Sequence, residues 1–482
     1  MSTADGRQYS LRADGTLRTF RSGLPSGIVN QPAASLPSAS LSRRGGVYSA
    51  SFRPDGKIVS LHTGGPNGIN IQHGARGWRV ITVHRADQST LVSTGRRSGY
   101  LEKTIDRDGR TLVERTYLSG DRSWRRFYDG SVQQPRNSAS LRPAGGNEPI
   151  RVVYKQYLPH YRYQPAFYNW ANRGWDPINY HWKWTSHRWF AYYGSYFYPW
   201  ASYPDGSFWL TDYILGQTLA DSYDMQQPDT GSVLADADSD ATLDNAPAYT
   251  GQQSGDETVY APYSTAIPSS VKQEIAAEVH RQLELESAAD SETGSTQPEA
   301  PGDPAQFMQP GHIFIVSTPI QASVYWEGTQ LTTELTGQQC SLTPGDVLRL
   351  YSIPSPIRGA STDSSNFNGN VYSGELEVVS SQRADCPVGV HVMLTTVALQ
   401  EMENNFQAHL DDGLHMLYSQ QDKDGLPAAP STTVTEQPAS ADPASSAASL
   451  GAELQSLQTQ ANRAEAQVTQ TLQSAQTDSN QP

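Results

Sequence analysis

The sequence predicts a mainly β, multi-domain protein, and three observations carry this prediction. Asp-Gly pairs recur between runs of β-forming residues in the first 150 positions. A block dense in tyrosine and tryptophan follows, and a second group of β-forming runs holds both cysteines of the 482-residue chain. Hydrophobic residues make up 37% and charged residues 17% of the chain. Because both shares are low for a globular protein, we expect folded modules separated by acidic, low-complexity linkers and a similar tail.

Residues 1–150 predict a basic antiparallel β-meander. Asp-Gly tolerates the positive φ of a type I′ turn, and it occurs at 5–6, 14–15, 55–56, 108–109 and 129–130. Strand-forming runs flank several of these pairs, at 47–52, 57–62, 78–84, 111–117 and 124–128. The irregular spacing of the pairs favours a meander of hairpins over a strict repeat.

The charge is divided unevenly along the chain. Residues 1–150 hold 22 Lys or Arg against 11 Asp or Glu, whereas residues 214–482 hold 7 against 35. Two interpretations follow: the acidic part folds back on the basic meander, or it keeps the molecule soluble. A basic surface also makes nucleic-acid binding a second alternative function, with phosphates engaged by the meander.

Residues 151–224 form a Tyr/Trp-rich segment that ends in a short helix. Positions 154–213 hold 23 of the 46 aromatic residues and seven of the ten tryptophans, with few aliphatic residues before Leu210. Rings alone fill space poorly, so we expect some of them to be exposed or packed against another domain. Leu215, Leu219 and Tyr223 share the spacing of one helix face.

Exposed rings with cations beside them predict a surface for polysaccharide or another envelope polymer. The candidate binding residues are Trp170, Arg173, Trp175, Trp182, Lys183, Trp184, Arg188, Trp189 and Trp200. The alternative interpretation is that these rings form a core around the meander. Nucleic-acid bases stack on such rings as well, but nucleic acid is not the partner that we expect.

Catalytic signatures are missing from the sequence: it contains no nucleophile elbow, no HExxH pair and no Walker A loop. A glycan-acting hydrolase is the alternative function, with a pair of carboxylates drawn from Asp176, Asp205 and Asp212. Metal binding or acid–base chemistry is the less favoured interpretation of His160, His181 and His187. We therefore expect no enzyme activity, no cofactor and no metal.

An amphipathic helix is predicted at 269–286, between an acidic linker at 225–268 and a second linker at 287–310. Ser270 is a good N-cap, with Gln273 three residues later as the partner of a capping box. The apolar residues that line one face of this helix are Val271, Ile275, Val279 and Leu283.

Residues 311–421 predict a small β module with a covering helix. Candidate strands lie at 312–317, 322–326, 347–351, 374–379 and 388–394, and a helix begins near Thr396. Cys340 and Cys386 are 46 residues apart within this module. A disulfide between them would contribute roughly 3–4 kcal/mol and fits an oxidising compartment, while the alternative is two buried thiols.

The tail, 422–482, is of low complexity and contains one possible helix. Its apolar positions alternate between spacings of four and three, at Leu450, Leu454, Leu457, Ala461, Ala464 and Val468. This pattern allows a weak coiled coil. Because two of the positions are alanine, the favoured interpretation is a transient helix in a disordered tail.

Several stretches of the chain carry a resemblance to a group of proteins. They are DGKIVSLH (55–62), STGRRSGYLE (93–102), the Tyr/Trp/Gly block, FWLTDYIL (208–215), VKQEIAAEV (271–279), CSLTPGDVL (340–348), GLHML (413–417) and GLP (425–427). In these the chain resembles uncharacterised, exported proteins of the kind found in Acidobacteria-type genomes. The resemblance covers about residues 50–428, implies export and carries no established activity.

The predicted function is that of a non-enzymatic structural or binding protein of the cell envelope or exterior. Its expected partners are a glycan or envelope polymer and further copies of itself. The polar start of the sequence shows no signal peptide, which leaves a cytoplasmic location open, and no apolar run is long enough to span a membrane.

Overall fold

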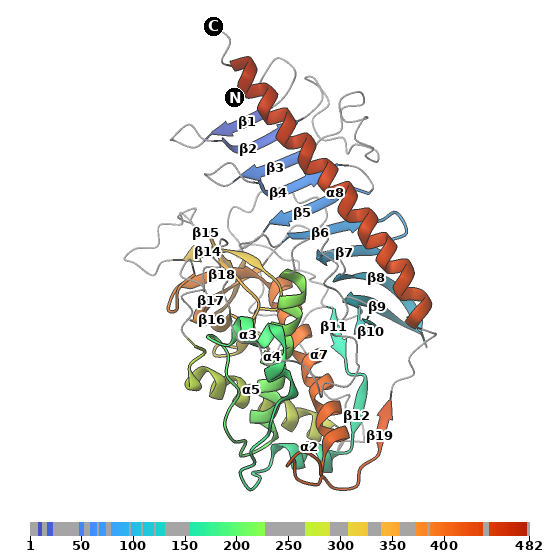
Figure 1. The fold of residues 1–482 in the computed structure, drawn as a ribbon, viewed down its shortest axis with the longest axis vertical. Helices are drawn as coiled ribbons and strands as arrows, with labels where there is room; N and C mark the ends of the chain where they lie inside the picture. Colours follow the sequence, from blue (N-terminus) through green and yellow to red (C-terminus); the bar gives the residue numbers. More distant parts are fainter. Residues whose placement is uncertain are drawn as a thin grey trace, which may run out of the picture.

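The computed structural model describes most of the chain as a long meander of strands, a group of helices and a smaller sheet (Figure 1). The described residues are 8–11, 17–22, 48–52, 58–64, 67–73, 79–95, 98–107, 109–119, 122–130, 155–226, 266–289, 307–325, 339–356, 372–382, 386–436 and 443–479. The predicted mainly β architecture, with a β-meander and an aromatic cluster, is confirmed. Most of the two predicted linkers lies outside the described residues.

The meander is an 11-stranded antiparallel sheet in which the strands follow one another in chain order. Its strands are β1 (Gln8–Leu11), β2 (Leu17–Ser22), β3 (Tyr48–Phe52), β4 (Ile58–Thr63), β5 (Ile69–His73), β6 (Arg79–His84), β7 (Thr90–Gly95), β8 (Ser98–Arg107), β9 (Arg110–Ser119), β10 (Arg122–Asp129) and β11 (Gln156–Leu158). The predicted strand-forming runs match β3, β4, β6, β9 and β10, whereas β1, β2, β5, β7, β8 and β11 were not predicted. Strand β11 also extends the meander past residue 150, where the predicted domain ended.

Three of the predicted Asp-Gly pairs, at 14–15, 55–56 and 108–109, lie between strands that pair with each other in antiparallel fashion. Gly109 has φ of 73°, the left-handed value that glycine adopts without strain, and Arg107 pairs with Arg110 across the hairpin. The pair at 129–130 ends β10 instead, where Asp129 accepts a hydrogen bond of 2.5 Å from Arg110. The Asp-Gly pairs at 5–6, 14–15 and 55–56 lie outside the described residues.

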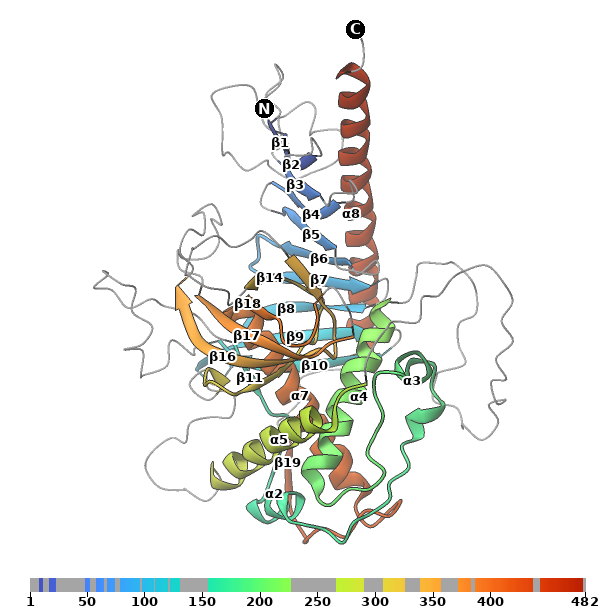
Figure 2. The ribbon, with the colours of Figure 1, turned by 90° about the vertical axis from the view of Figure 1, so that its left-hand side faces the viewer.

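Helix α8 (Pro443–Ser479) lies along one face of the meander (Figure 2). The six apolar positions of the predicted tail helix are all buried, and they pack against Leu61, Ile71, Ile81 and other side chains of the sheet. Gly99 of β8 permits this approach, because a Cβ atom there would lie 2.8 Å from a methyl of Leu454. The tail is therefore neither a transient helix nor a coiled coil, since the apolar stripe of α8 faces a sheet.

The helical part contains α2 (Pro165–Asn172), the 3-10 helix η4 (Lys183–Ser186), α3 (Arg188–Tyr193), α4 (Gly206–Gln226), α5 (Ser269–Ala289) and α7 (Thr396–Gln420). These helices share one hydrophobic core. Two ends differ from the prediction. Helix α4 begins at Gly206 and has 21 residues, so it is not short. Helix α5 begins before Ser270, and the carbonyl of Pro268 accepts a hydrogen bond from the amide of Lys272.

The second sheet has six strands in the order β13-β16-β17-β18-β14-β15. They are β13 (Ile313–Ile315), β14 (Ile320–Tyr325), β15 (Gln339–Leu342), β16 (Val347–Pro356), β17 (Tyr372–Ser380) and β18 (His391–Thr395). The sequence predicted five of these strands and missed β15. A two-stranded pair of β12 (Tyr161–Tyr163) and β19 (Val434–Glu436) lies beside the lower part of α7 in Figure 1.

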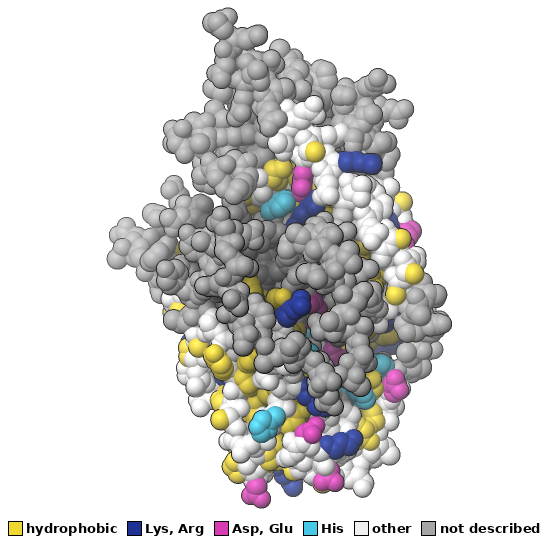
Figure 3. All heavy atoms as spheres, viewed as in Figure 1, with side chains coloured by type: hydrophobic (Ala, Val, Ile, Leu, Met, Phe, Trp, Pro, Cys, Tyr) yellow, Lys and Arg dark blue, Asp and Glu magenta, His cyan; other side chains and the backbone are white. Residues whose placement is uncertain are grey.

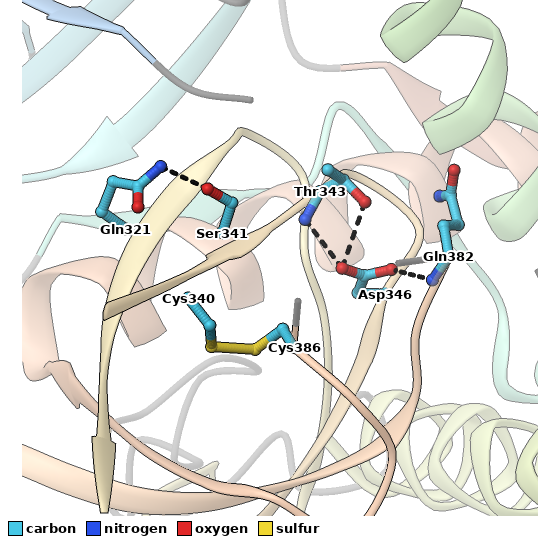
Figure 4. The surroundings of a disulfide bond; sticks show 7 residues. All are labelled: Gln321, Cys340, Ser341, Thr343, Asp346, Gln382 and Cys386. Carbon is cyan, nitrogen blue, oxygen red and sulfur yellow. Dashed lines mark hydrogen bonds between the residues drawn. A yellow bond between two sulfur atoms is a disulfide. The ribbon is translucent and has the colours of Figure 1, made fainter. Parts of the chain in front are cut away.

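The predicted disulfide between Cys340 and Cys386 is present, with the two Cα atoms 5.1 Å apart (Figure 4). It ties β15 to the segment before β18. Beside it, Asp346 accepts hydrogen bonds from the amides of Thr343 and Gln382 and so fixes the turn that leads into β16. Tyr196 donates its hydroxyl hydrogen to the carbonyl of Gly345 in the same turn, which joins this sheet to the aromatic core.

Candidate functional site

The aromatic segment is the core of the helical part. Trp182 stacks on Trp184 with ring centroids 4.1 Å apart, and on Trp209 with centroids 4.7 Å apart. Trp184 lies over Gly216 of α4, where a Cβ atom would be 2.2 Å from the indole ring. The missing side chain at Gly216 therefore makes room for this ring.

Three of the predicted stacking rings lie inside the protein. Trp182, Trp184 and Trp189 are 7%, 7% and 6% exposed, which leaves no ring face for a polymer. Their assignment as a binding surface was wrong, because α4 at the end of the segment, together with α5 and α7, supplies the aliphatic side chains that pack between the rings. The aliphatic residues of the shared core include Leu215, Leu219, Ile275, Val279, Leu283 and Leu410.

Trp200 is half-buried, and the ammonium group of Lys272 lies over its indole ring. The ammonium of Lys272 lies 3.9 Å from the centroid of Trp200, and Phe208 packs against the same indole at 4.7 Å. Lys272 also donates a hydrogen bond to the carbonyl of Tyr198. These contacts assign Trp200 to the support of a buried lysine rather than to ligand stacking.

Lys272 forms a buried ion pair with Asp212 of α4, with Nζ and Oδ1 2.6 Å apart. The carboxylate also accepts hydrogen bonds from the Trp200 amide and the Tyr203 hydroxyl. Burial raises the pKa of Asp212 and lowers the pKa of Lys272, and the attraction between the two charges opposes both shifts. The ion pair joins α4, which carries Asp212, to α5, which carries Lys272. Because Asp212 is fully buried, a substrate cannot reach its carboxylate.

A different pair of rings is left at the surface, formed by Trp170 at the end of α2 and Trp175 in the loop that follows. Both are half-buried, with ring centroids 5.3 Å apart and an interplanar angle of 37°. Trp175 donates from Nε1 to the carbonyl of Trp170 and from its amide to the carbonyl of Pro204. Phe167 stacks on Trp170 at 5.3 Å. The orientation of both indoles is thus set by contacts inside the protein.

Charged and polar side chains surround this Trp170–Trp175 pair in the sequence and remain in water. Arg173 lies between the two rings along the chain and is exposed, as is Asp176 directly after the pair. Lys183 and Arg188 are also exposed, although the tryptophans next to them point inward. Over the helical part, at the bottom of Figure 3, hydrophobic side chains stay visible between charged and histidine side chains.

The candidate acidic groups have separate structural roles. Asp205 accepts hydrogen bonds from the amides of Ser207 and Phe208, which is the role of a helix N-cap at the start of α4. Asp212 is held in the ion pair described above, and Asp176 is on the surface. Buried Asp212 and exposed Asp176 therefore do not face one another across an open cleft.

The three candidate histidines are also dispersed. His160 packs against Tyr161 with ring centroids 4.4 Å apart, and the carbonyl of His187 accepts the amide of Ala191 in α3. His181 is exposed. Among the described residues, no group of three or more His, Cys, Asp or Glu side chains is arranged to hold a metal ion.

The basic meander meets the acidic half of the chain through ion pairs. Arg79 binds Glu465 of α8 at 3.1 Å, and Arg85 binds Glu453 of α8 at 2.8 Å. Arg126 binds Asp412 of α7 at 2.8 Å. Of the two interpretations of the charge pattern, the acidic part folds back on the basic part. These arginines are then engaged inside the molecule, which weakens the nucleic-acid alternative.

Lys272 is the residue of this region that the sequence analysis did not single out. It follows Val271 in an amphipathic helix, and this position in the sequence does not predict a contact with Asp212. A lysine in a helix can be predicted to be buried only when its carboxylate partner is known. For Lys272 that partner, Asp212, lies 60 positions earlier in the sequence.

Comparison with protein-family models, with curated proteins and with solved structures gives no match to this chain. None of the helices described by the structure is both long enough and apolar enough to cross a membrane. The function is therefore inferred from the geometry of the chain's own residues.

Proposed function

We propose that this is a non-enzymatic structural or binding protein of the cell envelope or exterior, which holds polysaccharide or another envelope polymer at the Trp170–Trp175 pair. The observation that carries the proposal is a pair of neighbouring indoles that stay half-exposed while Trp182, Trp184 and Trp189 of the same segment are buried. Large rings left at a surface beside hydrogen-bonding groups are typical of ligand sites.

The internal contacts of the pair support a binding role. Hydrogen bonds from Trp175 to Trp170 and Pro204 fix the two rings before any ligand arrives. Such preorganisation lowers the entropy that a ligand loses on binding. Arg173, exposed next to the rings, offers a planar cation for hydroxyl or carboxylate groups.

An oxidising location is supported by the disulfide between Cys340 and Cys386. Stable disulfides occur mainly in secreted and periplasmic proteins, and they are rare in the reducing cytosol. The cell envelope or exterior is therefore the compartment that we propose.

Retention on insoluble polymers tests the proposal. The unaltered protein, Trp170→Ala and Trp175→Ala are incubated with peptidoglycan, chitin and cellulose, and unbound protein is measured. We expect retention on at least one polymer and a loss of about fivefold or more in each variant, since stacking of a nucleic-acid base on one aromatic ring contributes roughly 1–3 kcal/mol.

Tyr198→Ala is the matched control, because Tyr198 is a 62% exposed ring outside the pair. Thermal unfolding of all four proteins establishes that the variants are folded. If Trp175→Ala and Tyr198→Ala behave alike, or if no polymer retains the unaltered protein, the proposed role of the pair is wrong.

A further inference from the structure

The two faces of the meander differ in chemistry along β4 to β7. The cross-strand register aligns Leu61 with Ile71 and Ile81 on the face under α8. Because side chains alternate between faces along a strand, the intervening residues point the other way. The same register aligns His62 with Asn70 and Thr82 on this second face.

This second face, opposite α8, is polar and is most accessible on β4 to β6, since Val92 of β7 is buried. His62, Gln72 and His84 are exposed, and Asn70 and Thr82 are half-exposed. The register places the following described side chains on it: Ser60, His62, Asn70, Gln72, Val80, Thr82, His84, Thr90 and Val92. None of these residues is Asp, Glu, Lys or Arg. Seven of them carry hydroxyl, amide or imidazole groups, whereas Val80 is half-buried and Val92 is buried.

The polar row continues into a ladder of rings on the next three strands. Val92 pairs with Tyr100, Tyr100 with Tyr117, and Tyr117 with Trp124. The ring centroids of Tyr100 and Tyr117 are 5.2 Å apart, and those of Tyr117 and Trp124 are 5.5 Å apart. Strands lie about 4.8 Å apart, so the row from His62 to Trp124 runs for about 29 Å across the sheet.

We propose that the outer face of β4 to β7 binds a neutral polyhydroxylated polymer, an uncharged glycan chain that lies across the strands toward the ring ladder. Hydroxyl groups of a glycan both donate and accept, as the Asn, Gln, Thr and His side chains of this face do. A rigid sheet presents these groups at fixed spacing, which limits the entropy lost on binding.

Other classes of partner fit this face less well. A nucleic acid requires cations for its phosphates, and Arg79 of β6 binds Glu465 of α8 on the other face instead. A stable protein interface is built on a fully buried apolar and aromatic core, which the exposed His62, Gln72 and His84 do not provide. For an anionic glycan, the side chains that the structure describes on the outer face of β4 to β7 include no Lys or Arg.

Affinity electrophoresis tests this inference, with hydroxyethyl cellulose and galactomannan as neutral polymers and alginate as a polyuronate. We expect a neutral polymer to retard the unaltered protein and alginate to have no such effect through this face. The double variant His62→Ala/Gln72→Ala should lose at least fivefold in apparent affinity. Gln455→Glu, on the exposed side of α8, is the control that should keep it.

Absence of retardation in both neutral polymers, retardation by alginate alone, or an unchanged double variant would each overturn the inference. Trp175→Ala on the same gels separates this surface from the Trp170–Trp175 pair. If only Trp175→Ala weakens binding, the proposed function stands and the meander face is not a site. If only His62→Ala/Gln72→Ala weakens it, the meander face is the site and the ring pair is not.

Discussion

Arg115 of β9 and Glu401 of α7 form a two-point ion pair, although 286 residues separate them in the sequence. Both terminal nitrogens of the guanidinium donate to the two carboxylate oxygens at 2.7 Å. The arginine side chain is 4% exposed and lies between the rings of Tyr100 and Tyr128, 5.0 and 4.5 Å from their centroids. A buried cation of the basic meander thus anchors the acidic half of the chain.

Replacing Arg115 is expected to destabilise the protein strongly. Arg115→Met keeps the apolar volume but leaves the half-buried Glu401 and the Glu102 carboxylate without their guanidinium, and breaking such a pair costs about 3 kcal/mol or more. Glu401→Gln retains one acceptor at a 39% exposed position and should cost about 1 kcal/mol. Urea unfolding measures both, and equal effects of the two variants would contradict the buried-cation account.

The charge pattern of the sequence predicted that the two halves could meet, but it did not predict this pair. Arg115 was one of 22 basic residues in the meander, and nothing in its neighbours marked it as buried. Its burial depends on α7 crossing β9 and β10, which is a relation between segments far apart in the chain. The spacing of apolar residues indicates whether a segment is a helix or a strand and which of its faces is buried. Which other segment packs against that face depends on the whole fold.

The apolar face of α8 is expected to be essential for the stability of the meander. Leu454→Ala removes a fully buried side chain between α8 and β8, and such a change costs about 2–5 kcal/mol. Hydrogen exchange should become faster in β5 to β8, because α8 covers these strands. Gln455→Ala, at the exposed neighbouring position, should leave exchange unchanged. Similar exchange in the two variants would mean that α8 does not support the sheet.

The seam of α8 and the rings of the aromatic segment show where sequence patterns succeed and fail. The seam positions were correct, because their spacing of four and three requires one apolar helix face. The element that packs against them was not predicted, since an apolar helix face of this kind packs equally well against a sheet or a second helix. The aromatic segment misled for a related reason: the aliphatic residues that fill gaps between its rings come from α4, α5 and α7.

Reduction of the disulfide is expected to destabilise the six-stranded sheet selectively. Cys340 and Cys386 close a loop of 46 residues, which corresponds to about 4 kcal/mol in the loop-entropy account. Cys340→Ala/Cys386→Ala should lower the midpoint of thermal unfolding and remove its dependence on dithiothreitol. The unaltered protein, measured with and without the reductant, is the comparison. A midpoint that reduction leaves unchanged would show that the crosslink contributes nothing to stability.

Asp411 of α7 is expected to make stability fall as the pH rises from about 4 to 6. Burial raises its pKa to about 6, although the amide of His160 and the hydroxyl of Tyr157 both donate to it. Between pH 4 and 6 the folded protein therefore keeps a proton that the unfolded chain has lost, and folding becomes less favourable by up to about 3 kcal/mol. Asp411→Asn should remove this part of the slope in urea unfolding at pH 4, 5, 6 and 7, while Asp176→Asn, at an exposed carboxylate, should keep it. Parallel pH profiles for the unaltered protein and Asp411→Asn would show that Asp411 titrates as it does in an unfolded chain.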